Sequence, residues 1–318
     1  MGNQLSKRRQ KVDSNPSLNF NTPSFQDGST SMHSQPNFPP YSLYFPSDEE
    51  ATERFRKIHY LMKHVFQRNY FAPVDSALQS PGAMALDVGC GAYATWAVDM
   101  ANDFPNATFY AIDLVDPFPA EDTLAIEHVP KNLFIDVANI LDGLQFPDNA
   151  FDYVHQRIMC SVYHGDDIGF IMRELRRVTK PGGWLDLIEP DLLPKRAGPL
   201  MKKLSESIYN YQKRVQDHMF VGPRIRRFLV DSGFVEVNTD YVSLPLCWGG
   251  FVGKNTYEAV LSGYRHMGQY VYREVLGDKA GDSYDEQQFD AYMDKAFDEC
   301  VEYQTFFNVY WACGRKPQ

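Results

Sequence analysis

The sequence predicts an α/β fold in which a doubly wound, mostly parallel sheet is covered by helices on both faces. Short apolar segments alternate with helical ones between residues 83 and 190, and repeated β–α units of this kind form parallel sheets. The 318 residues are 44% hydrophobic and 14% aromatic, which is enough for a substantial core. A glycine turn at Gly89-Cys90-Gly91 follows the first apolar segment, and we place the functional site around it.

The predicted elements follow one another in a regular order. The first is an amphipathic helix over 48–70 with Asp48 as its N-cap, because apolar residues recur on one face and Asp caps helices well. Strands are predicted at 83–88, 108–113, 133–137, 151–155, 184–189, 234–238 and 306–312. Helices are predicted at about 94–103, 166–178, 198–217 and 223–232, and over 250–304 as an insertion. The strand after this insertion is expected to pair with the sixth strand as an antiparallel hairpin.

The composition argues against several classes of protein. The net charge of −10 disfavours bulk affinity for nucleic acid, so no nucleic-acid partner is expected. No run of 18 or more apolar residues is present, so no transmembrane helix is predicted. The first residues also lack the apolar segment of a secretory signal. The five cysteines are scattered without a CxxC pair, which favours reduced thiols in the cytoplasm over disulfides or a metal site.

The start of the chain carries a signal of its own. Residues 1–46 are rich in Ser, Asn, Gln and Pro without an apolar period, and we interpret them as a disordered tail. The opening letters MGNQLS match the pattern for N-myristoylation of Gly2. Lys7, Arg8 and Arg9 follow, and a basic cluster is the second anchor that a single acyl chain needs. We therefore predict contact with a membrane surface through a myristoylated, basic N-terminus.

The predicted site lies where the strands end. In an open α/β sheet, ligands bind beyond the carboxyl ends of the strands. This rule gathers eight residues around one crevice: Asp87, Gly89, Gly91, Asp113, Asn139, His155, Gln156 and Glu189. The two glycines let the backbone turn and let a ligand approach it closely. Asp113 suits the two hydroxyls of a ribose, and Asn139 offers an amide to the edge of a purine, with Ile140 packed on its face.

Two nucleotide ligands fit this pattern. Gly89-x-Gly91-x-x-Ala94 satisfies a loose dinucleotide fingerprint, and Asp113 would then hold the ribose of NAD in an NAD-dependent oxidoreductase. Asp87 favours another ligand, because a carboxylate two residues before the first glycine repels a pyrophosphate and attracts a positive charge. A nucleoside with a cationic or amine group is therefore favoured over a dinucleotide.

The chain resembles the class I S-adenosylmethionine-dependent methyltransferases, and within them the fungal small-molecule and regulator-type branch. The matching segments are 86–91, 111–113, 139–144, 148–152 and 177–183. The resemblance implies a seven-stranded Rossmann-like methyltransferase sheet with an antiparallel C-terminal strand and a helical insertion at about 250–304. It covers about residues 48–247 well and the remainder weakly, and we expect the methyltransferase domain to span 47–318.

The resemblance further implies which residues meet the cofactor, S-adenosyl-L-methionine. Asp87, Gly89 and Gly91 would surround the methionine part, Asp113 the ribose, and Asn139 with Ile140 the adenine. One departure concerns Ala92-Tyr93, which stand where the family has a further glycine or a Pro-Gly pair. Tyr93 would bring bulk close to the cofactor, and this supports the alternative of a non-catalytic, cofactor-binding regulatory protein.

The methyl acceptor is expected to be a small molecule, and O-, N- and C-methylation all stay open. A methyl group on a sulfonium is already activated, so alignment supplies much of the catalysis. A general base is needed only when the acceptor arrives protonated. The candidates for this role are His155 and Glu189, with His164 and Asp191 nearby. Tyr163, Trp248 and Tyr264 are candidates either for the wall of the acceptor pocket or for the core.

Overall fold

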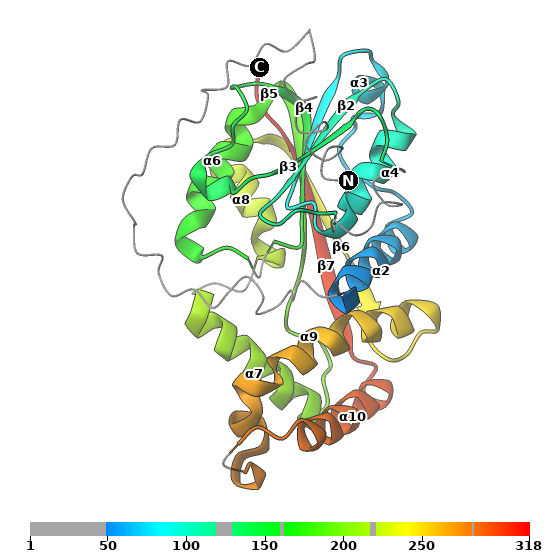
Figure 1. Cartoon of the computed structure of the whole chain (residues 1–318), viewed down its shortest axis with the longest axis vertical. Helices are drawn as coiled ribbons and strands as arrows, with labels where there is room; N and C mark the ends of the chain where they lie inside the picture. Colours follow the sequence, from blue (N-terminus) through cyan, green and yellow to red (C-terminus); the bar gives the residue numbers. More distant parts are fainter. Residues whose placement is uncertain (1–48, 119–128, 160–161, 217–220, 282) are drawn as a thin grey trace, which may run out of the picture.

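A seven-stranded sheet forms the centre of the molecule (Figure 1). The structure is a computed structural model and describes residues 49–118, 129–159, 162–216, 221–281 and 283–318. The predictions for the tail 1–46, for Gly2 and for Asp48 as a helix cap lie outside these residues. No helix within the described ranges is long and apolar enough to cross a bilayer.

The strands are arranged in the order β3-β2-β1-β4-β5-β7-β6. Their bounds are β1 Met84–Val88, β2 Thr108–Asp113, β3 Leu133–Val137, β4 Phe151–Arg157, β5 Thr179–Pro190, β6 Val235–Pro245 and β7 Phe306–Arg315. The first five strands pair in parallel, and β7 runs antiparallel between β5 and β6. The predicted fold class, including its antiparallel C-terminal strand, is confirmed.

Helices cover both faces of this sheet. Their bounds are α2 Glu49–Phe66, α3 Asp75–Gln79, α4 Thr95–Asp103, α6 Ile168–Val178, α7 Pro199–Gln216, α8 Ile225–Asp231, α9 Phe251–Leu276 and α10 Glu286–Glu302. Figure 1 shows α6 and α8 on one side of the sheet and α3 and α4 on the other. The side of α6 that carries Ile171, Leu175 and Val178 packs into the core, as its apolar period predicts.

The structure differs from the predicted boundaries in several elements, and in three of them one end moves by four residues or more. Strand β5 begins at Thr179 instead of residue 184, because Thr179 already pairs with Phe151 ahead of a shift in register. Strand β6 continues to Pro245 instead of ending at 238, because it pairs with β7 along this length. Most of β6 is exposed at the edge of the sheet, so its sequence lacks a buried apolar run. Helix α2 ends at Phe66, and the next residue has a φ of 55°.

Helices α7, α9 and α10 form a lobe beyond the end of the sheet where β5 ends and β7 begins (Figure 1). The lobe has an apolar core of its own, in which Tyr264 is buried. Thr305 ties the lobe to the sheet, since its carbonyl accepts hydrogen bonds from Leu246 N at 2.9 Å and Trp248 Nε1 at 2.6 Å. Tyr264 and Trp248, two candidates for the acceptor pocket, therefore support the lobe itself.

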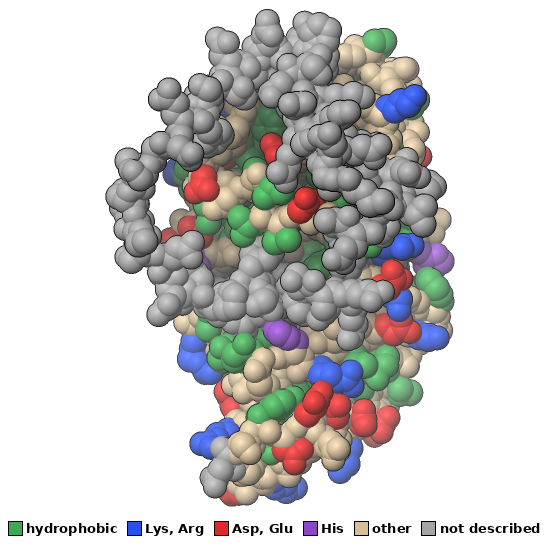
Figure 2. Space-filling view, viewed as in Figure 1, with side chains coloured by type: hydrophobic (Ala, Val, Ile, Leu, Met, Phe, Trp, Pro, Cys, Tyr) green, Lys and Arg blue, Asp and Glu red, His purple; other side chains and the backbone are tan. Residues whose placement is uncertain are grey.

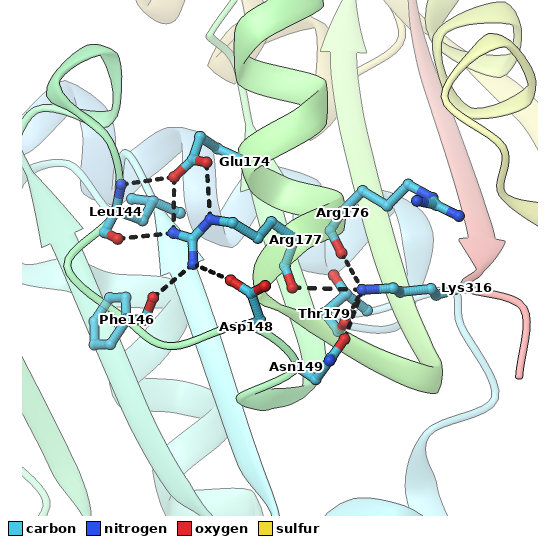
Figure 3. Close-up of polar contacts among 9 residues, drawn as sticks. All are labelled: Leu144, Phe146, Asp148, Asn149, Glu174, Arg176, Arg177, Thr179 and Lys316. Atoms are coloured by element: carbon cyan, nitrogen blue, oxygen red, sulfur yellow. Dashed lines mark hydrogen bonds and ion pairs between the residues drawn. The ribbon is translucent and has the colours of Figure 1, made fainter. Parts of the chain in front are cut away.

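At the amino ends of β4 and β5, Arg177 and Lys316 organise a network of polar contacts (Figure 3). The Arg177 guanidinium donates to both carboxylate oxygens of Glu174 at 2.8 Å and to Asp148 at 2.9 Å. It also donates to the carbonyls of Leu144 and Phe146 at 2.8 and 2.7 Å. This part of the segment 177–183, which the resemblance singled out, therefore holds the sheet together at the end opposite the predicted crevice.

We expect Arg177→Ala to lower the free energy of unfolding by about 1–3 kcal/mol, because it leaves two carbonyls and two carboxylates without this donor. Urea denaturation measures this change. Arg227→Ala is the matched control, because it removes only an exposed contact with Asp231 and should cost about 0–1 kcal/mol. Equal losses in the two variants would contradict the prediction.

Candidate active site

The glycine loop leaves β1 at the carboxyl edge of the sheet and folds back over β2. Gly89 N and Cys90 N both donate to the carbonyl of Ile112, at 2.9 and 3.0 Å. Gly89 has a φ of +73° and Gly91 a φ of +65°, a region that favours glycine. A Cβ at Gly89 would also lie 2.4 Å from Met159 Sδ, whereas a Cβ at Gly91 would meet no atom of the described residues within 4 Å. Among these residues, the backbone of Gly91 therefore borders open space that a ligand can enter.

Tyr93 takes up a left-handed conformation directly after the loop. Its φ is 61° and that of Ala94 is 44°, and both belong to the short 3₁₀ turn η2, Ala92–Ala94, that precedes α4. The Tyr93 N–H donates to the Pro117 carbonyl at 2.8 Å, and its ring packs edge-on against Phe118. The bulk of Tyr93 is thus held by the segment after β2, and the space beside Gly91 stays clear of it.

Asp113 ends β2 and fixes the shape of the two neighbouring loops. Its Oδ2 accepts a hydrogen bond from Gly91 N at 2.9 Å, and its Oδ1 accepts one from Val115 N at 3.2 Å. A carboxylate oxygen can accept more than one hydrogen bond. Asp113 can therefore brace the glycine loop and also meet the hydroxyls of a ribose.

Asp87, near the end of β1, is a buried carboxylate without an ion pair. Its side chain is 3% exposed, and its Oδ2 has no hydrogen-bond partner among the described residues. Burial raises the pKa of Asp87 to about 7, while the positive charge of Arg157 acts in the opposite direction. An orphaned buried carboxylate oxygen is costly, so this position suits a ligand that brings a positive charge.

Apolar side chains are exposed where β2 and β3 end. These are Leu114, Val115, Val137 and Leu141. Asn139 uses its side-chain oxygen to accept a hydrogen bond from Leu141 N at 3.1 Å, and Ile140 is buried in the core beneath. Figure 2 shows hydrophobic and acidic side chains next to one another over the central part of this face. Leu114, Val115 and Leu141 were missed from sequence, although an apolar pair directly after an acidic strand end is a usable signal.

The two catalytic candidates lie in different surroundings. His155 is fully buried and stacks on Trp96 with 3.8 Å between ring centroids. Burial holds its pKa well below the usual value, so the imidazole is neutral. Glu189 is also buried, and its Oε1 accepts a hydrogen bond from Met159 N at 2.9 Å. The packing of His155 against Trp96 gives no support to a catalytic role, whereas Glu189 reaches a cavity.

This cavity lies between the ends of β4 and β5 and the helices α6 and α8. Its polar lining comes from Gln156 and Glu189, and apolar side chains make up most of the remaining wall: Met159, Ile168, Ile171, Met172, Leu187, Val221, Ile225 and Phe228. Tyr163 also lines it and donates its hydroxyl to Gln156 Oε1 at 3.3 Å. Met159 separates the cavity from Gly89. Of the pocket candidates from the sequence, Tyr163 is therefore the one that borders this space.

His164 and Asp191, the other two candidates, support local structure. His164 lies at the start of the short turn before α6, where its backbone N–H donates to Asp167 at 3.1 Å. Asp191 forms an ion pair with Lys195 and accepts a hydrogen bond from Leu193 N at 3.2 Å.

A chain of polar side chains joins α2 to the end of β4. His59 Nε2 lies 2.9 Å from Asp99 Oδ2 in α4, and His59 Nδ1 lies 3.4 Å from both terminal nitrogens of Arg157. Lys63 forms an ion pair with the same Asp99 oxygen at 2.6 Å. These polar contacts could not be predicted from the sequence, because the residues come from three elements that are far apart in it. The described side chains hold no cluster of three or more His, Cys, Asp or Glu that could bind a metal ion.

Known proteins of similar sequence define the class to which this fold and site belong. Residues 86–187 match the family described as a methyltransferase domain. The N-methyltransferase tcpN of Claviceps purpurea is 26% identical over 280 residues, which cover 84% of this chain and 95% of that protein. Methyltransferase str3 of Strobilurus tenacellus is 30% identical over 213 residues, which cover 65% of this chain and 71% of that protein.

A regulator is also similar to part of the chain. The secondary metabolism regulator laeA of Coprinopsis cinerea is 30% identical over 158 residues, which cover 49% of this chain and 37% of that protein. Among solved structures, phosphoethanolamine N-methyltransferase 2 of Haemonchus contortus with bound S-adenosyl-L-methionine has a TM-score of 0.44 and 18% identity, covering 81% of this chain and 56% of that one. The chain belongs to the class I S-adenosylmethionine-dependent methyltransferases. The NAD-dependent oxidoreductase is therefore set aside.

The raised pKa of Asp87 makes the stability of the ligand-free protein depend on pH. A carboxyl with a pKa of about 7 when folded and about 3.9 when unfolded stabilises the fold below pH 4, and this contribution is lost as pH rises toward 7. We expect Asp87→Asn to be more stable than the wild type at pH 8 by about 2 kcal/mol, and the gain to shrink at pH 5. Chemical denaturation at both values measures it.

Asp231→Asn is the control for this comparison, since Asp231 is exposed on α8. A gain for Asp87→Asn that is the same at pH 5 and pH 8 would show that the carboxyl is not protonated in the folded protein.

Proposed function

We propose that this methyltransferase transfers the methyl group of S-adenosyl-L-methionine to a small-molecule acceptor, with nitrogen as the favoured methylated atom. The observation that carries the proposal is Asp87 Oδ2, which has no hydrogen-bond partner among the described residues and lies on the strand that leads into the loop where Gly91 borders open space among them. A buried negative charge next to a glycine backbone suits a nucleoside with a positively charged group. When bound, the cofactor supplies a methyl group already activated by its sulfonium.

Different residues of the crevice contact different parts of the cofactor. Asp87, Gly89 and Gly91 surround the methionine part, and the Asp113 carboxylate meets the ribose hydroxyls. Asn139 and Ile140 belong to the adenine end, where the exposed side chains of Leu114, Val115 and Leu141 offer an apolar surface to the ring. This assignment is supported by the two hydrogen bonds of Asp113, which hold the loop and the segment after β2 around one space.

The acceptor presents its nucleophile at the cavity that Gln156 and Glu189 line. Met159 lines this cavity and its side chain lies against Gly89, so the acceptor and the cofactor meet beside it. Apolar walls exclude water, and the Glu189 carboxylate orients a donor such as an amine and accepts its proton where the acceptor arrives protonated. We assign His155 to packing beneath the loop. Nitrogen is favoured because tcpN and verN are both named N-methyltransferases.

Transfer of a labelled methyl group tests this function. Wild-type protein, with S-adenosylmethionine labelled on its methyl group, is expected to label the small-molecule fraction of a fungal extract. Asp113→Ala should weaken cofactor binding at least 10-fold by calorimetry, because it removes both the ribose partner and the brace of the loop. Glu189→Gln should keep cofactor affinity and lower the transfer rate by about 100-fold.

Asp231→Ala, on the exposed side of α8, is the control and should change neither quantity. Label that enters only protein would overturn the small-molecule acceptor. Cofactor binding without any transfer would favour the regulatory alternative, which the similarity to laeA suggests.

We also propose that Gly2 is N-myristoylated and brings the protein to membrane surfaces, as the MGNQLS start and the basic residues after it suggest. Co-expression with an N-myristoyltransferase and an alkyne-tagged myristate should label the wild type and leave Gly2→Ala unlabelled. The labelled protein should float with vesicles that contain anionic lipid, and float less after Lys7, Arg8 and Arg9 are all changed to Ala. Absence of label on the wild type would refute the proposal.

A further inference from the structure

We infer that Arg157 and Asp87 together grip the amino-acid end of the cofactor, with Arg157 on its carboxylate and Asp87 on its ammonium group. We further infer that His59 of α2 is the positioning residue that holds Arg157 for this contact. The inference rests on the proposed function and adds two residues to it. It gives a function to the series of polar contacts that joins His59 of α2 to Arg157.

Arg157 has more N–H donors than the described residues accept. It lies at the carboxyl end of β4 and is half-buried. Its contacts within the described chain are with His59 Nδ1, at 3.4 Å from each terminal nitrogen, and it makes no ion pair with a described carboxylate. A guanidinium carries five N–H donors in a planar fork that matches a carboxylate. A half-buried guanidinium at a ligand crevice with only long contacts to a neutral nitrogen therefore points to an anionic group that is to be bound.

The opposite charge lies on the neighbouring strand. Asp87 pairs in register with His155, and Arg157 follows His155 by two residues on the same face of β4. Arg157 and Asp87 are close enough for each to shift the pKa of the other. Among the described residues, Asp87 Oδ2 has no hydrogen-bond partner, and the hydrogen bonds of Arg157 are with His59. A ligand group with a carboxylate and an ammonium on one carbon satisfies both at once, and an α-amino acid is such a group.

Helix α2 contributes to this contact through His59. His59 is fully buried and its pKa is lowered, chiefly by burial, so the ring is neutral. One tautomer suits both neighbours, because Nε2–H can donate to Asp99 while Nδ1 accepts from Arg157. The Asp99 carboxylate is held charged, with its pKa lowered to about 2 by His59 and Lys63. Asp99 thus orients the ring, and the ring holds Arg157 at the end of β4.

The inference predicts a specific pattern of ligand affinities. S-adenosylhomocysteine and 5′-methylthioadenosine share the nucleoside and the thioether, but only the first has an amino-acid end. Calorimetry should show at least 100-fold tighter binding of S-adenosylhomocysteine to the wild type. Arg157→Met should weaken that ligand at least 10-fold and leave methylthioadenosine within 2-fold. Asp87→Asn should have the same selective effect, since it removes the partner of the ammonium group.

Variants of His59 test the positioning role. His59→Ala should reduce the discrimination between the two ligands, and His59→Asn should restore part of it, because the amide oxygen replaces Nδ1 as the acceptor for Arg157. Arg56→Met is the control, as this residue belongs to the same helix and makes only an exposed contact with Glu53. Melting temperatures of all variants establish that they are folded.

Three results would overturn the inference. They are equal binding of the two ligands by the wild type, an equal loss for both ligands in Arg157→Met, and no loss for either. If the wild type bound neither ligand, the proposed function itself would fail. That outcome differs from each of the other three.

Discussion

The hydrogen bond from Gly91 N to Asp113 Oδ2 is the contact on which the rest of the site depends. It joins the loop after β1 to the end of β2, and the second carboxylate oxygen reaches Val115 N in the next segment. With the Ile112 carbonyl holding Gly89 and Cys90, the loop stays in a left-handed path that leaves its backbone facing open space. A buried carboxylate is costly to desolvate, and here backbone donors offset that cost.

Asp87 and Asp113 are both buried near one loop, an arrangement that suits a ligand with a positive charge. Burial is the main cause of the raised pKa of Asp87, repulsion from Asp113 adds to the shift, and Arg157 opposes it. The sheet supplies the geometry, because parallel strands bring their carboxyl ends to the same edge. His59 Nδ1 of α2 lies 3.4 Å from both terminal nitrogens of Arg157, so the first helix borders these charges as well as packing in the core.

The cavity beside Met159 differs from the charged surroundings of the glycine loop. The cavity beside Met159 is apolar apart from Gln156 and Glu189, and a dry wall strengthens the few polar contacts within it. The lobe of α7, α9 and α10 has its own core and is tied to the sheet through Thr305. The lobe therefore packs independently of the glycine loop.

The sequence by itself determined the inner part of the fold. Strands β2 and β3 were predicted with the bounds that the structure has, and β1 within one residue, because central parallel strands are short apolar runs that stand out from the helices around them. It also singled out Asp87, Gly89, Gly91 and Asp113, which the structure brings to one edge of the sheet, since glycine and acidic residues at strand ends reflect local backbone needs. The extension of β6 could not be read in the same way, because an exposed edge strand carries no buried apolar pattern.

Only the tertiary structure decided the partners of these residues. Arg157 and His59 are 98 positions apart in the chain, and no local pattern shows that a histidine of the first helix meets an arginine at the end of β4. The place of His155 at a strand end likewise suggested catalysis, and no local pattern shows its stacking on Trp96. The backbone requirements of a turn can be predicted from neighbouring residues. Long-range contacts form only when the whole core packs, and the contacts between the charged residues of this site are long-range.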